Sequence, residues 1–184
     1  MQNPQWRKLG VLYNPETSSD GATHPKLATH AANPLPIWLN DDVFRIYFSA
    51  RDDDNRSSVS YIEADICKRE VLFISKTPVF LHGEPGCYYS HGVSLGNAYV
   101  VGGKSYLTFM GWVRPQNGHW MGEIGRLLMN ADGSLSIENA APFFPIGGVD
   151  PVSLSYPWIL GDPQNGYRMW YGSTLTWDTP GREM

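Results

Sequence analysis

Several features are scarce in this sequence, and each scarcity excludes a class of protein. No apolar stretch approaches the roughly 20 residues that span a membrane, and the N-terminal MQNPQWRKLG has no apolar signal-peptide core. We therefore expect a cytoplasmic protein with no membrane partner. Only 17% of the 184 residues are charged, and no basic run exceeds two residues. A surface that follows phosphates has little to be built from, so no nucleic-acid partner is expected.

Cysteine is also scarce. Cys67 and Cys87 could pair, but two cysteines in a chain without a signal peptide are more often reduced thiols, and we assign them no chemistry. No His, Cys, Asp or Glu cluster has a spacing specific enough to predict a metal, and no cofactor is predicted. Apolar residues make up 42% of the chain, which is typical of one globular domain with a real core.

The periodicity of the apolar residues favours strands throughout. Apolar and polar residues alternate in FRIYFSAR, SVSYIEAD, VLFISKTPVF and SYLTFMGW, and Asp, Asn, Gly or Pro bounds each segment. The nearest candidate for a helix is GEIGRLLMNADG, but it is short and its NADG reads as a hairpin turn. The sequence therefore predicts an all-β fold.

A threefold internal repeat organises these strands. The stretch from His30 to Arg51 returns as His91 to Trp112, and again from Ser153 to Ser173. When the three copies are superimposed, Phe48, Phe109 and Tyr171 coincide. FISKTPVF is echoed by SIENAAPFF, each ending near a Pro-x-Phe. A repeated unit of four strands is typical of a β-propeller blade, and a β-sandwich is the alternative.

The segments NGYRMWYGS and RIYFSARD resemble the five-bladed β-propeller glycoside hydrolases of families 32, 43, 62 and 130, and the related propeller domains attached to some sugar transferases. The resemblance runs from about Trp6 to the end and implies a single, partial propeller domain over residues 1–184. We expect blades at about 30–82, 91–145 and 153–184, the last one incomplete, with residues 6–15 as the outer strand of a closing blade.

Five blades of this length need roughly 300 residues, so two interpretations stay open. The chain is either a piece of a longer protein or one half of a homodimer that completes the propeller.

The resemblance implies three carboxylates on successive inner strands, because hydrolysis through an oxocarbenium-like transition state needs a general acid and an opposing carboxylate. The positions that match the family pattern lack them. Asn33 stands where an Asp is expected before Pro34, Ser155 where a Glu is expected in a Glu-x-Pro, and in the second copy His91 is the only titratable group. We keep Asn33, Ser155 and His91 as candidates for substrate binding.

Two other carboxylates are candidates for catalysis. Asp150 lies three residues before Ser153 and can either reach the central pocket or cap the loop. Asp52 ends the second strand in RDDDNRS, where an ordinary solvated turn is the alternative.

The remaining binding candidates are His30, Arg51 and Trp112. His30 and His91 hold the same place in successive copies of the repeat and are kept as candidates for substrate binding. Histidines repeated in this way could bind a metal or transfer protons, and the alternative is that they form hydrogen bonds to the backbone of the neighbouring copy. Arg51 and Trp112 end equivalent strands and would supply planar donors and an aromatic platform for a sugar. The sequence thus predicts a glycoside hydrolase-like protein that acts on or recognises carbohydrate, with a non-catalytic carbohydrate-binding or interaction propeller as the alternative.

Overall fold

The structure is a computed structural model, and it describes residues 6–17, 24–116, 118–162, 164 and 166–177. These residues form ten strands and one short 3-10 turn, so the prediction of an all-β chain is confirmed. No helix in this part of the chain is long and apolar enough to cross a membrane.

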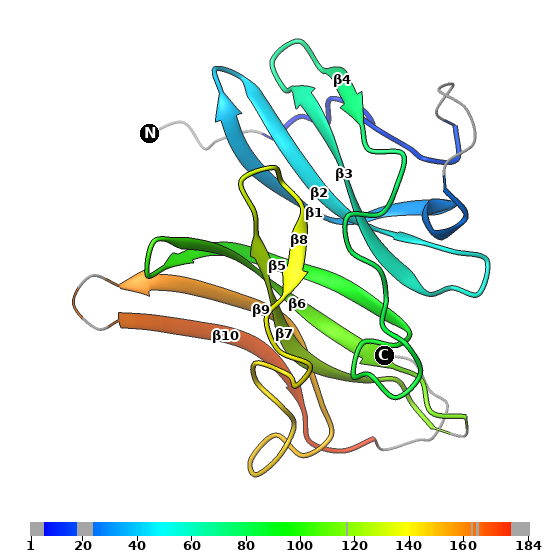
Figure 1. Cartoon of the computed structure of the whole chain (residues 1–184), viewed down its shortest axis with the longest axis vertical. Coiled ribbons are helices and arrows are strands. Elements are labelled where there is room, and N and C mark those ends of the chain that lie inside the picture. Colours follow the sequence, from blue (N-terminus) through cyan, green and yellow to red (C-terminus); the bar gives the residue numbers. More distant parts are fainter. Residues whose placement is uncertain (1–5, 18–23, 117, 163, 165, 178–184) are drawn as a thin grey trace.

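Two four-stranded antiparallel meanders and one pair of strands follow each other along the chain (Figure 1). The bounds are η1 Pro25–Leu27, β1 Thr29–Asn40, β2 Val43–Arg51, β3 Ser57–Asp65, β4 Glu70–Ile74, β5 Gly92–Val101, β6 Lys104–Val113, β7 Met121–Met129, β8 Leu135–Ile137, β9 Ser153–Asp162 and β10 Gly166–Thr174. We call β1–β4 the first sheet, β5–β8 the second and β9–β10 the third.

The expected hairpin chemistry is present at the turns. In NADG the N–H of Gly133 donates to the carbonyl of Asn130, and the N–H of Asn130 donates to the carbonyl of Ser134. The segment that precedes this turn is strand β7 and not a helix, because it pairs along its whole length with β6. Tertiary pairing here overrides a weak local helix preference.

The outermost strands are shorter than the sequence pattern indicates. β4 stops at Ile74, and the chain returns only at Phe80, which forms an isolated bridge to Val59. Phe144 bridges Ile124 in the same way in the second sheet. The Phe of each Pro-x-Phe thus makes a second, isolated bridge to the third strand of its sheet. The proline of the motif has no N–H to donate, which prevents a continuous ladder.

Two clusters of apolar side chains hold the sheets. Tyr47 and Val59 of the first sheet pack against Leu107 and Phe109 of the second, and all four are fully buried. The opposite face of the first sheet, around Phe48, is covered by η1 and by Tyr13, whose ring centroid lies 5.4 Å from that of Phe48.

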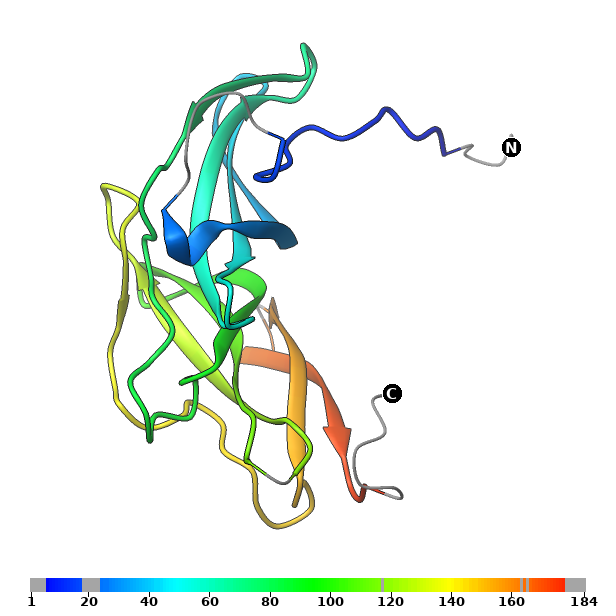
Figure 2. The ribbon, with the colours of Figure 1, turned by 90° about the vertical axis from the view of Figure 1, so that its right-hand side faces the viewer.

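One expected element is absent. Residues 6–15, predicted to be an outer strand, form no strand, because they have no ladder partner among the described residues. Their first part runs away from the sheets (Figure 2), and Trp6 is 98% exposed. The described residues form no closed ring, and the last part of the third predicted blade, residues 178–184, lies outside them.

Candidate functional site

Five of the predicted site residues, His30, Arg51, Asp52, His91 and Trp112, lie at one end of the sheets, because their strands pair in a continuous row. Thr29 pairs with Arg51, Arg51 with Ser57, and Ser57 with Gly92 in the one parallel contact between β3 and β5. The row continues through Trp112. We call this row, with the residues next to it, the starting end, because β1 and β5 both begin there.

The third sheet joins the same end through a side chain. Trp112 pairs with Gly122 of β7, whose N–H donates to the hydroxyl of Ser153 at 2.9 Å. Ser153 is the first residue of β9 and pairs with Thr174, the last residue of β10. The structure therefore brings the ends of all three copies of the repeat together, as the superimposed sequence copies imply.

Each first strand carries a β-bulge close to this end. The ladder shifts at Asn33 and Pro34 in β1, at Gly96 and Asn97 in β5, and at Tyr156 and Pro157 in β9, opposite Tyr171 of β10. A bulge changes the direction of a side chain and is common next to binding sites. Asn33, a predicted binding residue, is exposed at the first bulge and has a φ of 51°.

Tyr156 has the same feature at the third bulge. Its φ is 49°, it is 70% exposed, and like Asn33 it precedes a proline. A bulky residue rarely adopts a left-handed conformation, so the surrounding strands must enforce it. Sequence reasoning chose its neighbour Ser155 instead, and the Tyr-Pro pair was the signal that could have found Tyr156.

Asp52 is a buried structural carboxylate. It accepts hydrogen bonds from Lys26 Nζ at 2.8 Å and Arg56 Nε at 3.1 Å, and from the backbone N–H groups of Asp54 and Arg56. Burial alone would raise its pKa, but the bonds from Lys26 and from the Arg56 backbone outweigh burial and hold the pKa below the ordinary value. The turn interpretation of RDDDNRS is thus the better description, although the turn is buried and ion-paired rather than solvated.

His82 adds a fourth group to this cluster. Its Nε2 lies 3.8 Å from Asp52 Oδ2, is covered, and has no hydrogen-bond partner, while its Nδ1 lies 3.2 Å from the carbonyl oxygen of Gly83. Lys26 and His82 were missed from the sequence, because they lie far from Asp52 on either side along the chain and no local pattern links them.

His91 and Trp112 lie together, with ring centroids 6.0 Å apart. Trp112 Nε1 donates to the hydroxyl of Ser57 at 3.2 Å, and that hydroxyl also accepts from the N–H of Val93. The His91 backbone bonds to Ser57 and Trp112. Both residues therefore help to join the first two sheets, and their half-buried rings still form part of the surface of the starting end.

His30 and Arg51 are the two other candidates of the first sheet at this end. His30 is exposed, has a φ of 65°, and its Nδ1 lies 2.8 Å from the Thr29 hydroxyl. Arg51 donates to the side chain of Asn55 at 2.7 Å on the surface. A surface contact of this kind is weak, so the guanidinium remains available to a ligand.

The two candidates of the third sheet, Asp150 and Ser155, both contact other residues of the fold. Asp150 is only 7% exposed, its carboxylate accepts a hydrogen bond from the Tyr171 hydroxyl at 2.9 Å, and its backbone closes a loop with Gly147. This bond to the carboxylate raises the pKa of Tyr171. Ser155 lies over Gly172, where an added Cβ would meet the Ser155 hydroxyl.

The carboxylates that sequence analysis offered for catalysis are thus both engaged by partners of the fold. Among the described residues, no group of three or more His, Cys, Asp and Glu side chains is placed to hold a metal ion. The chemistry that the starting end offers without rearrangement is hydrogen bonding and ring stacking by His30, Arg51, His91 and Trp112.

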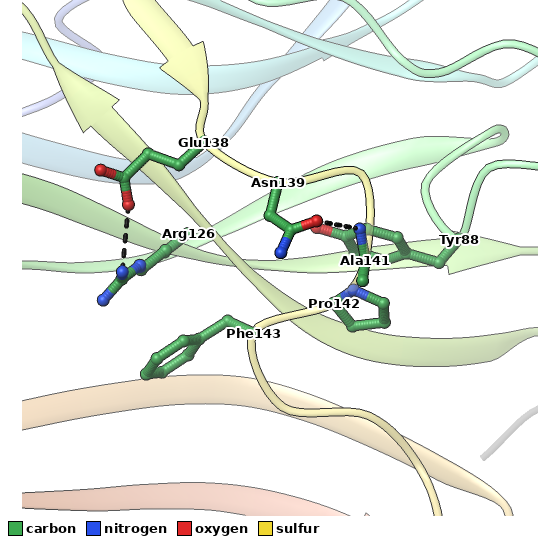
Figure 3. A pocket seen from close by; sticks show the side chains of 7 residues that line it. All are labelled: Tyr88, Arg126, Glu138, Asn139, Ala141, Pro142 and Phe143. Atoms are coloured by element: carbon green, nitrogen blue, oxygen red, sulfur yellow. Dashed lines mark hydrogen bonds and ion pairs between the residues drawn. The ribbon is translucent and has the colours of Figure 1, made fainter.

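The described surface has a hollow away from the starting end. A hollow of about 330 Å³ lies beside the loop after β8 and is lined by Tyr88, Arg126, Glu138, Asn139, Ala141, Pro142 and Phe143 (Figure 3). Its polar groups already bind one another: Arg126 pairs with Glu138 at 3.0 Å and lies over the rings of Tyr106 and Phe143. This hollow contains none of the predicted site residues.

Comparisons with known proteins agree with the class of fold. The chain is similar in structure to Zg3597, a family 117 glycoside hydrolase produced by the marine bacterium Zobellia galactanivorans, with a TM-score of 0.53 and 16% identity over 77% of this chain and 51% of that one. At this identity the likeness shows the fold and not the activity. It supports the predicted likeness to glycoside hydrolases, although family 117 is not among the families 32, 43, 62 and 130 that the sequence resembles.

Two curated relatives come from Mycobacterium tuberculosis: the uncharacterized proteins MT1551 (strain CDC 1551 / Oshkosh) and Rv1502 (strain ATCC 25618 / H37Rv). Each is 36% identical to this chain over 173 residues, which cover 94% of the chain and 56% of the relative. The chain therefore spans about half the length of the curated relatives it matches. No protein-family model matches it.

Proposed function

We propose that the three sheets are successive blades of a five-bladed β-propeller of the glycoside hydrolase type, and that the starting end recognises carbohydrate. The fold likeness to Zg3597 supports the class of protein. The repeat supports the blades, because the Pro-x-Phe bridge returns in equivalent places, at Val59 and at Ile124, and each first strand carries a bulge. Fold likeness alone is a weak warrant for function, so the site must carry the rest.

The observation that carries the proposal is the pairing row of the starting end. It places Arg51 and Trp112 on one line and His30 and His91 beside it. Sugars are bound by aromatic rings that cover their apolar faces and by planar donors that bind their hydroxyl or acidic groups. Two histidines, an arginine and an indole provide both kinds of contact.

The engagement of Asp52 and Asp150 favours recognition over hydrolysis. A glycosidase needs one carboxyl group that can donate a proton and a second that is free to attack or to activate water. Asp52 is ion-paired with Lys26 and Arg56, and Asp150 is bonded to the Tyr171 hydroxyl.

Hydrolysis is the second candidate function, and one observation favours it. The low pKa of Asp52 keeps this carboxylate ionised, as a nucleophile or base must be. Asp150 would then be the proton donor, after release from Tyr171.

Binding is tested by isothermal titration against a panel of neutral and acidic oligosaccharides. We expect Arg51→Ala and His30→Ala each to weaken binding at least tenfold with the fold unchanged, because both side chains are on the surface. Trp38→Ala is the matched control, since Trp38 is 64% exposed and lies near the far end of β1. Absence of binding across the panel, or equal loss in the control, would contradict the proposal.

Release of reducing sugar from the same panel separates the two candidates. We expect none from the wild-type chain. Turnover that is lost in both Asp52→Asn and Asp150→Asn would make the protein a hydrolase with these two carboxylates at work, whereas binding without turnover supports recognition.

A further inference from the structure

We propose that the third sheet, β9–β10, is a docking surface for a further β-meander of the same repeat, supplied by polypeptide of the kind that makes the curated relatives longer than this chain. The inference does not depend on carbohydrate binding. It rests on an uncovered apolar face and a free strand edge on the same two strands, and on what covers their counterparts.

The apolar face is contiguous. Trp158 and Trp170 are directly paired across β9 and β10 and are 55% and 53% exposed, and Leu160, next on this face of β9, is 57% exposed. Ile159, between them in sequence, is 5% exposed and bonded to the second sheet. Single exposed apolar residues are ordinary on a protein surface, but a connected patch of large ones marks an interaction site.

The repeat shows what this face lacks. In the aligned copies of the repeat, Trp170 of β10 corresponds to Tyr47 of β2 and to Thr108 of β6. Both of these counterparts are fully buried. Tyr47 donates to the carbonyl of Gly133 in the second sheet at 2.7 Å, and Thr108 to the carbonyl of Pro157 in the third at 3.2 Å. Each counterpart thus bonds to the backbone of the next sheet, and Trp170 has an indole N–H that could do the same.

The strand edge is open in the same place. β2 lies between β1 and β3, and β6 between β5 and β7, but among the described residues β10 pairs only with β9. An unpaired edge of nine residues presents free N–H and C=O groups to a further strand. The third sheet is therefore half of the unit that the first two sheets complete.

The two complete sheets also indicate the chemistry of the missing strand. Phe48 and Phe109 face the small residues Ser60 and Gly125 on the third strand, and in the second sheet a Cβ at Gly125 would collide with the Phe109 ring. Tyr171 holds the equivalent place in β10. The docking strand should therefore carry a small residue opposite Tyr171.

The next pair specifies a second feature. Ile46 faces Ile62 in the first sheet, and Leu107 faces Leu127 in the second. Met169 is the equivalent residue of β10, so the docking strand should carry an aliphatic side chain opposite it, two residues away from the small one.

A second copy of this chain satisfies these requirements less well. Two β10 edges that pair antiparallel are related by a twofold axis perpendicular to the joined sheet, so both Trp158–Trp170 faces stay on the same side and remain uncovered. A further meander covers both features, since one of its hairpins completes the sheet and the sheet that follows it packs on the face.

The edge is tested by adding the missing hairpin in place. The chain is produced with residues 121–137, which form β7 and β8, repeated after Met184. The segment 175–184 then replaces the segment 114–120 as the connection. The matched control carries the same extension with Glu123→Pro and Met129→Pro in the repeated copy. Ile124 donates away from β6, to the carbonyl of Phe144, so the N–H groups of residues 123 and 129 point toward the strand before β7. Proline at these two positions removes ladder donors on that edge without altering the small and aliphatic positions.

Hydrogen exchange over residues 166–174 is the measurement. We expect the amides of β10 that point away from β9 to exchange at least tenfold more slowly with the intact extension than with the proline control. Equal exchange in the two proteins would overturn the proposal. A dimer of the unextended chain with β10 already protected would also overturn it, because the second copy would then be the occupant.

The face is tested with the part of the MT1551 protein outside the 173 matched residues, co-expressed with this chain. We expect a one-to-one complex that Trp158→Asp and Trp170→Asp each abolish and that Trp38→Asp leaves intact. A complex equally sensitive to all three variants, or no complex although the hairpin extension protects β10, would restrict the surface to its edge and refute docking on the face.

Discussion

Replacement of Asn97 by alanine should separate the second and third sheets. The Asn97 side chain is 5% exposed and reaches from β5 to the backbone of β9, where it donates to the carbonyl of Ile159 at 2.7 Å and accepts from the N–H of the same residue at 2.8 Å. It also accepts from the Thr108 hydroxyl. One amide thus acts in the place of a strand that would otherwise pair with β9.

The magnitude follows from what Asn97→Ala leaves behind. The N–H and C=O of Ile159 lose their partners in a buried interface, and each unsatisfied buried group costs about 1–3 kcal/mol. The sum is about 2–6 kcal/mol, a large share of the roughly 5–15 kcal/mol by which a domain of this kind is stable. We therefore expect a clear fall in the urea midpoint.

The assay has a local component as well as a global one. Hydrogen exchange should become faster across β9 and β10 before it changes in β2 and β3, because the lost bonds belong to the third sheet alone. Asn139→Ala is the matched control, since Asn139 is exposed and bonds only to the nearby N–H of Ala141. A loss of stability below about 1 kcal/mol, or faster exchange spread evenly over all sheets, would refute the bridging role.

Three further predictions concern the junctions and the buried carboxylate. Gly96→Ala should cost about 1–3 kcal/mol in urea unfolding, because its Cβ would meet the carbonyl of Pro157 and the Thr108 hydroxyl, and equal stability would refute this contact. Tyr47→Phe should cost about 1 kcal/mol by the same assay through the lost bond to the Gly133 carbonyl, and no loss would mean that this bond is not formed in solution. Because the folded pKa of Asp52 is lowered, its contribution is complete above the ordinary carboxyl pKa of about 4 and is lost as the pH falls toward the folded value. Asp52→Asn should therefore unfold with a weaker pH dependence below about pH 4 than the wild-type chain, and parallel curves would disprove the assignment.

The sequence predicts the strands well because each carries its own signal. Alternation and bounding turns located β2, β3 and β6 to within a residue or two, since these strands have one apolar face against another sheet. The repeat correctly placed Phe48 and Phe109 in equivalent positions, and the structure buries both.

The errors have physical causes in partners that the local sequence does not show. Residues 6–15 look like the outer strand of a closing blade in the sequence, but a strand also needs a neighbour with which to form hydrogen bonds, and none of the described segments supplies one. β4 ends early because Pro78, which lies between its end and the bridge at Phe80, interrupts a ladder that the composition of the segment alone would permit.

The candidate site was predictable in its place and less so in its roles. Equivalent positions in the repeat identified the starting end, because residues at the same phase of equivalent strands meet when the strands pair in register. The role of Asp52 depends on Lys26 and His82, which come from η1 and from the loop before β5. No spacing rule connects such residues, so only the fold shows that this carboxylate is committed.

That commitment also decides what kind of activity the starting end can support. A carboxylate bonded at once to an ammonium, a guanidinium and two backbone N–H groups is held in place and strongly stabilised as an anion, so it makes a poor proton donor. Asp150 is held by one hydroxyl and by its own loop, and it is the carboxylate that a ligand could release at lower cost. The proposed carbohydrate binding would therefore need only His30, Arg51, His91 and Trp112 as they stand, whereas the alternative, hydrolysis, would need a change at Asp150 first. The effect of ligand on the Asp150–Tyr171 hydrogen bond is for this reason the most direct way to separate the two functions.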